Sequence, residues 1–130
     1  MKTIKLKIKN EVNLTKELKE FNSIVRYSFN RFQEGLKEKE VREKVNSLFK
    51  NNCWFTQCGI KVGQQLFKKH KNKHIIFGGK SLMIKYLKKL ITKEEYSKAK
   101  LLPINIQGEA CKKGNRLFNF DLVNSKIELK

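Results

Sequence analysis

Carboxylates are scarce in this 130-residue chain. Against 30 Lys and Arg there are 12 Asp and Glu, and the single aspartate is Asp121. A nuclease that works with two metal ions needs several carboxylates that converge on Mg²⁺. The sequence offers no such set, so we expect no enzyme, no catalytic residues, no metal site and no cofactor.

Cysteine is also scarce, and its spacing does not suit cross-linking. Cys53, Cys58 and Cys111 are odd in number, and the five-residue separation of the first two matches no zinc-binding motif. We therefore expect no disulfide and interpret all three as small, buried or half-buried apolar side chains.

Long apolar runs are missing as well. None approaches the ~20 residues that a membrane-spanning helix needs. The N-terminus alternates lysine with apolar residues, unlike a secretory signal peptide. We expect a cytoplasmic protein without a membrane partner.

Arginine is rare among the many cations. Only Arg26, Arg31, Arg42 and Arg116 accompany the lysines. A guanidinium group can read guanine edges in a bidentate way, whereas lysine contacts phosphate as a point charge. The balance favours contact with a nucleic-acid backbone, and hence recognition of shape over base sequence.

What the chain has in abundance is lysine without acid. Between Glu43 and Glu94 lie fifty consecutive residues, Lys44 to Lys93, with twelve lysines and no Asp or Glu. We call this stretch the acid-free segment. The formal net charge is +18, and a field of one sign repels itself in a compact state. We expect nucleic acid as the neutralising polyanion. The alternative is a solvated, lysine-rich surface in a lysine-biased organism.

Periodicity predicts helices in the middle of the chain and strands near its ends. Apolar residues recur every three or four positions in four segments, which predicts helices near 15–36, 37–50, 54–70 and 80–90. A capping box predicts a further helix near 92–100. Alternation or short apolar runs predict strands near 3–9, 75–77, 102–110, 115–122 and 126–130. The order predicts an α+β fold in one domain, 1–130: a small antiparallel β module, interrupted by a mostly helical insertion over 13–100.

Several local features refine this prediction. Thr15 is the expected N-cap of the first helix, and Thr92 with Glu95 forms a capping box. Two ion pairs at i,i+4 spacing are expected, Glu38 with Arg42 and Glu40 with Lys44. Gly59 and Gly63 share one helix face, which suits close approach of another helix or of a phosphate backbone. Loose helix packing is the alternative.

The candidate nucleic-acid-binding residues combine the densest charge with two glycine turns. Gly78-Gly79 precedes a helix and Gly114 precedes Asn115, and either turn can present backbone N–H groups to a phosphate or be a plain turn. The candidates are Lys68, Lys69, Lys71, Lys73, Lys80, Lys85, Lys88, Lys89, Lys112, Lys113, Asn115 and Arg116. Most aromatics of this stretch are needed for the core. Trp54, beside a helix start, is the candidate for base stacking.

Two histidines offer the one alternative chemistry. His70 and His74 lie at i,i+4 and could bind a metal or cut RNA as an acid–base pair. The four lysines around them raise the cost of placing a cation there. A small histidine-dependent ribonuclease therefore remains an alternative hypothesis.

The second half of the chain resembles a known family. Four segments carry the likeness: Ile75–Lys80, Ile91–Tyr96, Leu101–Ala110 and Gly114–Phe118. They resemble the N-terminal part of TnpB-like, RNA-guided transposon nucleases and their type V CRISPR effector relatives. The first half is similar more loosely, at Tyr27–Arg31 and Asn52–Phe55.

The resemblance implies a β-barrel wedge domain, OB-like, interrupted by a helical recognition lobe. In that family the two parts hold the guide-RNA scaffold and the guide–target duplex. A RuvC-like nuclease domain with the catalytic carboxylates follows, whereas this sequence stops at Lys130. We therefore expect no cleavage of the family's type from this polypeptide.

Taken together, the sequence predicts a noncatalytic RNA-binding protein whose partner is a structured, guide-type RNA. It would act as a decoy or antagonist of a guide-RNA system, anti-CRISPR-like, or as half of a split effector. Duplex nucleic acid is a further candidate partner. The main alternative is a basic module that docks on an acidic protein such as a CRISPR effector.

Overall fold

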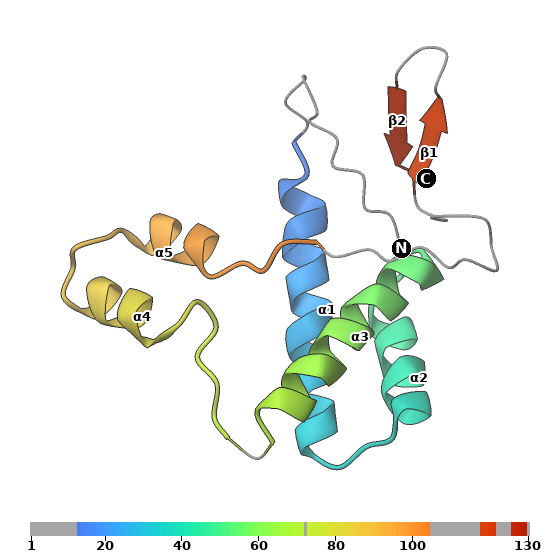
Figure 1. Cartoon of the computed structure of the whole chain (residues 1–130), viewed down its shortest axis with the longest axis horizontal. Coiled ribbons are helices and arrows are strands. Elements are labelled where there is room, and N and C mark those ends of the chain that lie inside the picture. Colours follow the sequence, from blue (N-terminus) through green and yellow to red (C-terminus); the bar gives the residue numbers. More distant parts are fainter. Residues whose placement is uncertain (1–12, 72, 105–117, 122–125, 130) are drawn as a thin grey trace.

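The computed structural model describes residues 13–71, 73–104, 118–121 and 126–129. Five helices and two strands follow one another there (Figure 1): α1 (Thr15–Gln33), α2 (Glu38–Leu48), α3 (Cys53–Lys69), α4 (Lys80–Leu87), α5 (Lys93–Ala99), β1 (Phe118–Asp121) and β2 (Lys126–Leu129). Helices α1, α2 and α3 pack into a bundle. Helices α4 and α5 form a separate pair that projects to one side. Residues 80–99 are called the arm below.

Helix α1 is the longest helix and the centre of the bundle. Its buried residues recur at helical spacing and include Phe21, Ile24, Val25, Ser28, Phe29 and Phe32. Thr15 is its first residue and not the cap, because the Asn13 side-chain oxygen accepts a hydrogen bond from the Thr15 N–H at 3.1 Å. The chain turns away at Gly35, whose φ of +88° lies in the region that glycine adopts without strain.

Glycine allows α3 to lie unusually close to α1. A Cβ placed on Gly63 would come within 2.9 Å of the Val25 carbonyl oxygen and 3.2 Å of the Phe29 nitrogen. One on Gly59 would lie 2.6 Å from Ile24 Cγ2. The two glycines therefore face another helix at close range, and both are buried. This face is not open to a phosphate backbone.

Helix α2 completes the bundle by burying Val41 and Val45. At its start the Glu40 carboxylate accepts a hydrogen bond from the Lys37 N–H at 2.8 Å. The predicted Glu38–Arg42 ion pair is present at 2.9 Å. Glu40 caps the helix in place of the predicted pairing with Lys44, because its carboxylate reaches back to an N–H that the helix leaves without a partner.

The arm is held together mainly by two stacked rings. Tyr86 of α4 and Tyr96 of α5 lie with centroids 4.6 Å apart and planes 11° apart. The predicted capping box at the start of α5 is confirmed, since Thr92 Oγ1 accepts from the Glu95 N–H and Glu95 Oε2 accepts from the Thr92 N–H, both at 3.2 Å. Helix α4 ends before the predicted position, because Lys89 takes a φ of +57°.

One side of α1 attaches the arm to the bundle. Asn22, buried to 2% exposure, pairs with Leu102 after the arm: its Nδ2 donates to the Leu102 carbonyl at 2.8 Å and its Oδ1 accepts from the Leu102 N–H at 2.7 Å. Before the arm, Phe77 meets Phe29 edge to face with centroids 6.2 Å apart. The Arg26 guanidinium lies 4.8 Å from the Phe77 ring centroid. Asn22, Arg26 and Phe29 follow one another at helical spacing along this side.

The chain enters and leaves the arm at almost the same point. Gly78 has a φ of +90°, and a Cβ on it would lie 2.8 Å from Lys100 Cβ and 3.0 Å from Lys100 Cα. Only glycine fits this position for both reasons. The close contact and the positive φ account for Gly78 without a phosphate ligand.

The predicted α+β fold with a β barrel is wrong, because helices dominate the described structure. Its two strands form only a two-stranded antiparallel sheet, in which Phe118 pairs with Leu129 and Asp121 with Lys126. Residues 75–77, predicted as a strand, lie along α1 as irregular chain, and so do 102–104. The predicted strand 3–9 and the rest of 102–110 lie outside the described residues. Phe77 and Leu102 find their partners on a helix and not on a neighbouring strand, which is why the apolar run misled the prediction.

Replacing Gly63 by alanine should destabilise the bundle. Alanine favours a helix over glycine by about 1 kcal/mol, but its methyl group meets the backbone of α1, which cannot rotate away. We expect a net loss of about 1–3 kcal/mol, measured by urea unfolding followed by circular dichroism. Gln65→Ala, exposed on the same helix, should change stability by less than about 0.5 kcal/mol. A stabilised Gly63→Ala protein would refute the close packing.

Asn22→Ala should release the segment that follows the arm. The substitution leaves the Leu102 N–H and carbonyl without partners, at an expected cost of about 1–3 kcal/mol. Hydrogen exchange at the Leu102 amide should accelerate strongly. The control is Ser23→Ala, since the Ser23 hydroxyl donates only to the exposed Lys19 carbonyl within α1. Unchanged exchange at Leu102 in the Asn22 variant would contradict the pairing.

Candidate nucleic-acid interface

Acidic residues are absent from one part of the described chain, the part that includes α3 and α4. In the described part, acids lie on α1, α2, α5, the two strands and the turn after α1: Glu17, Glu20, Glu34, Glu38, Glu40, Glu43, Glu94, Glu95, Asp121 and Glu128. Helices α3 and α4 and the chain between them carry none. The acid-free segment thus includes two whole helices, α3 and α4.

The first group of candidate lysines surrounds the C-terminal end of α3. Lys68 and Lys69 form its last turn, and Lys71 and Lys73 follow; all are exposed. We call these four the α3-end lysines. The Lys73 carbonyl accepts a hydrogen bond from Gln33 Nε2 at 3.3 Å, which holds the segment near the end of α1. Cations at a helix C-terminus also complement the helix dipole, so this group has a structural benefit of its own.

The second group lies on the arm. Lys80, Lys85, Lys88 and Lys89 are exposed on α4 and the turn after it; we call them the arm lysines. The ion pairs found among the described residues, Arg31–Glu34 and Arg42–Glu38, involve neither group. The charge of these lysines is therefore not neutralised by a described carboxylate.

The two groups lie on different parts of the molecule. Figure 1 shows the end of α3 at the foot of the bundle and the arm at its side, joined by the segment 70–79. That segment carries exposed Lys71, Lys73 and His74. The described structure thus offers two basic regions linked by a basic segment. The other candidates, Lys112, Lys113, Asn115 and Arg116, lie outside the described residues, as does Cys111.

A polar stripe on α3 was missed by the sequence reasoning. Gln57, Lys61, Gln65 and Lys68 follow one another at helical spacing, and the last three are exposed. The signal was available, because a period of three or four applies to the outer face of a helix as well as to its core. The stripe extends the α3-end lysines along the helix with side chains that donate hydrogen bonds.

Trp54 does not meet the requirement for base stacking. It is buried to 8% exposure in the core cluster with Phe55 and Cys58. The Lys61 ammonium lies 5.5 Å from the centroid of its ring. The residue lies in the first turn of α3, as expected, but its ring is buried in the core.

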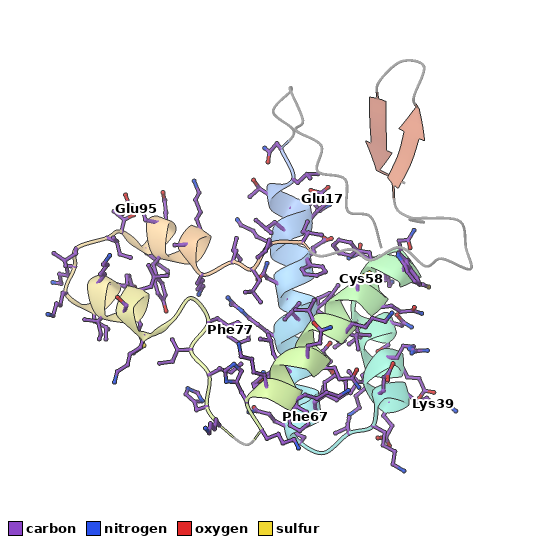
Figure 2. The ribbon with its side chains drawn as sticks, in the orientation of Figure 1. Glu17, Lys39, Cys58, Phe67, Phe77 and Glu95 are labelled. Atoms are coloured by element: carbon purple, nitrogen blue, oxygen red, sulfur yellow. The ribbon has the colours of Figure 1, made fainter. Side chains whose placement is uncertain are left out.

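The described arginines serve the fold. Arg26 contacts Phe77, Arg42 pairs with Glu38, and Arg31 pairs with Glu34 while its guanidinium lies 5.0 Å from the Tyr27 ring centroid. Lysine is thus the cation presented by α3 and the arm. Figure 2 shows the side chains, with Phe77 between the bundle and the arm.

The histidine alternative loses its geometric basis. Helix α3 ends at Lys69, so His70 is its C-cap and His74 lies in the irregular segment beyond. The i,i+4 spacing therefore does not place the two rings on one helix face. Within the described ranges, no group of three His, Cys, Asp or Glu side chains is placed to hold a metal ion. Cys58 is buried as expected, whereas Cys53 is exposed.

Among the described helices, none has the length and apolar character that crossing a membrane requires.

No protein-family model matches the chain, and no curated protein or solved structure shows significant similarity to it.

Trp54, the chain's single tryptophan, reports directly on whether a base stacks on it. Because the ring is buried, its fluorescence should resist quenching by acrylamide in the folded protein and become accessible in urea. Saturating RNA should leave the emission nearly unchanged. Strong static quenching by RNA would show that the ring is available to bases.

Proposed function

We propose that this protein is a noncatalytic RNA-binding protein whose exposed lysines bind phosphates of a structured RNA. The observation that carries the proposal is that all eight described candidate lysines are exposed and lie in a part of the chain that carries no acid. A surface field of one sign destabilises the folded protein by self-repulsion, but it attracts a polyanionic ligand.

The arrangement favours backbone contact. Lysine side chains are long, flexible point charges that adapt to phosphates without reading base edges. Two basic regions on different parts of the molecule suit an RNA whose folded shape brings phosphates to both. Structured RNA fits this requirement better than a short single strand.

The biological role that we propose follows the family resemblance. A guide-type RNA would be held without being cut, in the cytoplasm, by a decoy or antagonist of a guide-RNA system or by half of a split effector. No cofactor or metal ion takes part in this proposal.

The salt dependence of binding tests the proposal. With about 6–10 phosphates contacted, affinity for a labelled RNA hairpin should fall about 10³- to 10⁵-fold between about 50 and 200 mM salt. Fluorescence anisotropy measures this directly. A flat salt response would sink the proposal. So would purified protein that carries an acidic partner protein and no nucleic acid.

Matched lysine variants distinguish a specific interface from net charge. Changing Lys68, Lys69 and Lys71 together to Gln should reduce the salt slope by about 2–3. Changing Lys37, Lys39 and Lys44 to Gln removes the same charge from α2 and its N-cap, where glutamates intersperse the exposed lysines, and should have a much smaller effect. Equal effects of the two triple variants would indicate attraction by net charge alone.

A separate prediction concerns the contribution of the arm lysines to RNA affinity. Replacing Lys85, Lys88 and Lys89 by Gln should weaken binding to RNAs of different sequence by a similar factor, because phosphate contacts carry no sequence information. Competition with RNAs of equal shape and different sequence checks this. Loss of affinity for one sequence alone would contradict backbone recognition.

A further inference from the structure

The tip of the arm exposes large apolar side chains. Leu90 is 69% exposed, Leu87 67% and Ile84 39%. Of the large hydrophobic side chains that the described residues expose, only Leu48, at 60% on α2, lies elsewhere. Three exposed aliphatic side chains therefore gather within seven positions of the chain.

These side chains are exposed because the arm is too small to cover them. The inward side of α4 is taken up by Tyr86, which stacks on Tyr96 of α5. Among the described elements α4 contacts only α5. Ile84 and Leu87 lie three positions apart on α4. Leu90 follows in the turn after it, and all three side chains are left exposed by α5.

Lysines alternate with these apolar side chains. Lys85 follows Ile84, and Lys88 and Lys89 separate Leu87 from Leu90. Lys89 takes a positive φ between the two leucines, so the chain leaves the helical path there. A surface that covers the leucines must therefore also accept cations. This excludes the tip of a second copy of this chain, which would bring like charges together.

We infer that the tip is a wedge for interrupted RNA helices, in which Leu87 and Leu90 contact an exposed base face while Lys88 and Lys89 bind the adjacent phosphates. The inference rests on the proposed function. Base faces are flat and apolar, and phosphates border them on both sides. Apolar side chains flanked by cations are used in this way to enter base steps.

The wedge also narrows the class of RNA. Unstacking a base is least costly where the stack is already broken, at a bulge, a loop or a helix end. The preferred ligand is therefore a hairpin with an interruption and not a continuous duplex. An RNA long enough to reach the α3-end lysines as well would neutralise both basic regions, whereas a lipid surface at the tip would leave those at the foot of the bundle uncovered (Figure 1).

Two hairpins test the wedge. One carries 2-aminopurine in a single-nucleotide bulge, and the other has the same stem fully paired. The unaltered protein should prefer the bulged RNA by about 10- to 100-fold, the size expected when one leucine side chain is buried against an apolar surface, and binding should change the 2-aminopurine fluorescence.

Variants of the full chain separate the contribution of the leucines from that of the lysines. Leu87→Gln with Leu90→Gln should abolish the preference and the fluorescence change while keeping the salt slope. Lys88→Gln with Lys89→Gln should weaken both RNAs equally and lower the slope by about 2. Leu48→Gln, an exposed leucine on α2, is the matched control and should change neither quantity. All substituted side chains are exposed, and circular dichroism verifies that each variant folds.

The outcomes distinguish this inference from the proposed function. If the leucine variant keeps both the bulge preference and the fluorescence change, the wedge is wrong and RNA binding stands. If the unaltered protein binds neither hairpin, both fail. Leucine-dependent sedimentation with phosphatidylglycerol vesicles, but not with phosphatidylcholine vesicles, would then assign the tip to an anionic lipid surface and overturn the inference.

Discussion

Helices α1 and α3 lie so close together at Gly63 that there is no room for a methyl group between α3 and the α1 backbone. The other described features depend on this contact. With one side of α1 occupied by α3, a different side remains for Asn22, Arg26 and Phe29 to hold the segments on either side of the arm. The direction of α3 determines where its last turn, with Lys68 and Lys69, meets solvent. Side chains far apart in the sequence are thus positioned by one helix.

The described helices differ in the balance of acidic and basic residues that they carry. On α2 glutamates and lysines alternate, and a local ion pair and a capping carboxylate use part of the acid. On α3 and α4 the lysines have no such neighbours. Such a field costs stability in the absence of a ligand and supplies long-range attraction in its presence. The described arginines, in contrast, are engaged with Phe77, Tyr27, Glu34 and Glu38.

Local sequence signals predicted the local structure well. The apolar period located the first four helices, and the Thr92–Glu95 capping box located the fifth. The capping box and the Glu38–Arg42 pair were recognisable because each involves neighbours within about one turn. The predictions that were wrong concern residues whose contacts are distant in the sequence. Leu102 bonds to Asn22, eighty positions away, and no local pattern reveals that an apolar run will lie on a helix and not in a sheet. Helical spacing predicted the exposure of Lys85 on α4. It could not predict that the candidate lysines form two regions, because this division depends on the direction of the arm. The burial of Trp54 was missed because it depends on packing against residues of other helices.

The contact between Gly78 and Lys100 has an architectural consequence. The arm begins and ends at neighbouring points of the structure. If it were deleted, a very short linker could join the two remaining chain ends. The arm can therefore be shortened, lengthened or replaced without moving the three helices of the bundle. The protein therefore combines three helices that tolerate little change at their glycines with an arm whose length can change without disturbing them.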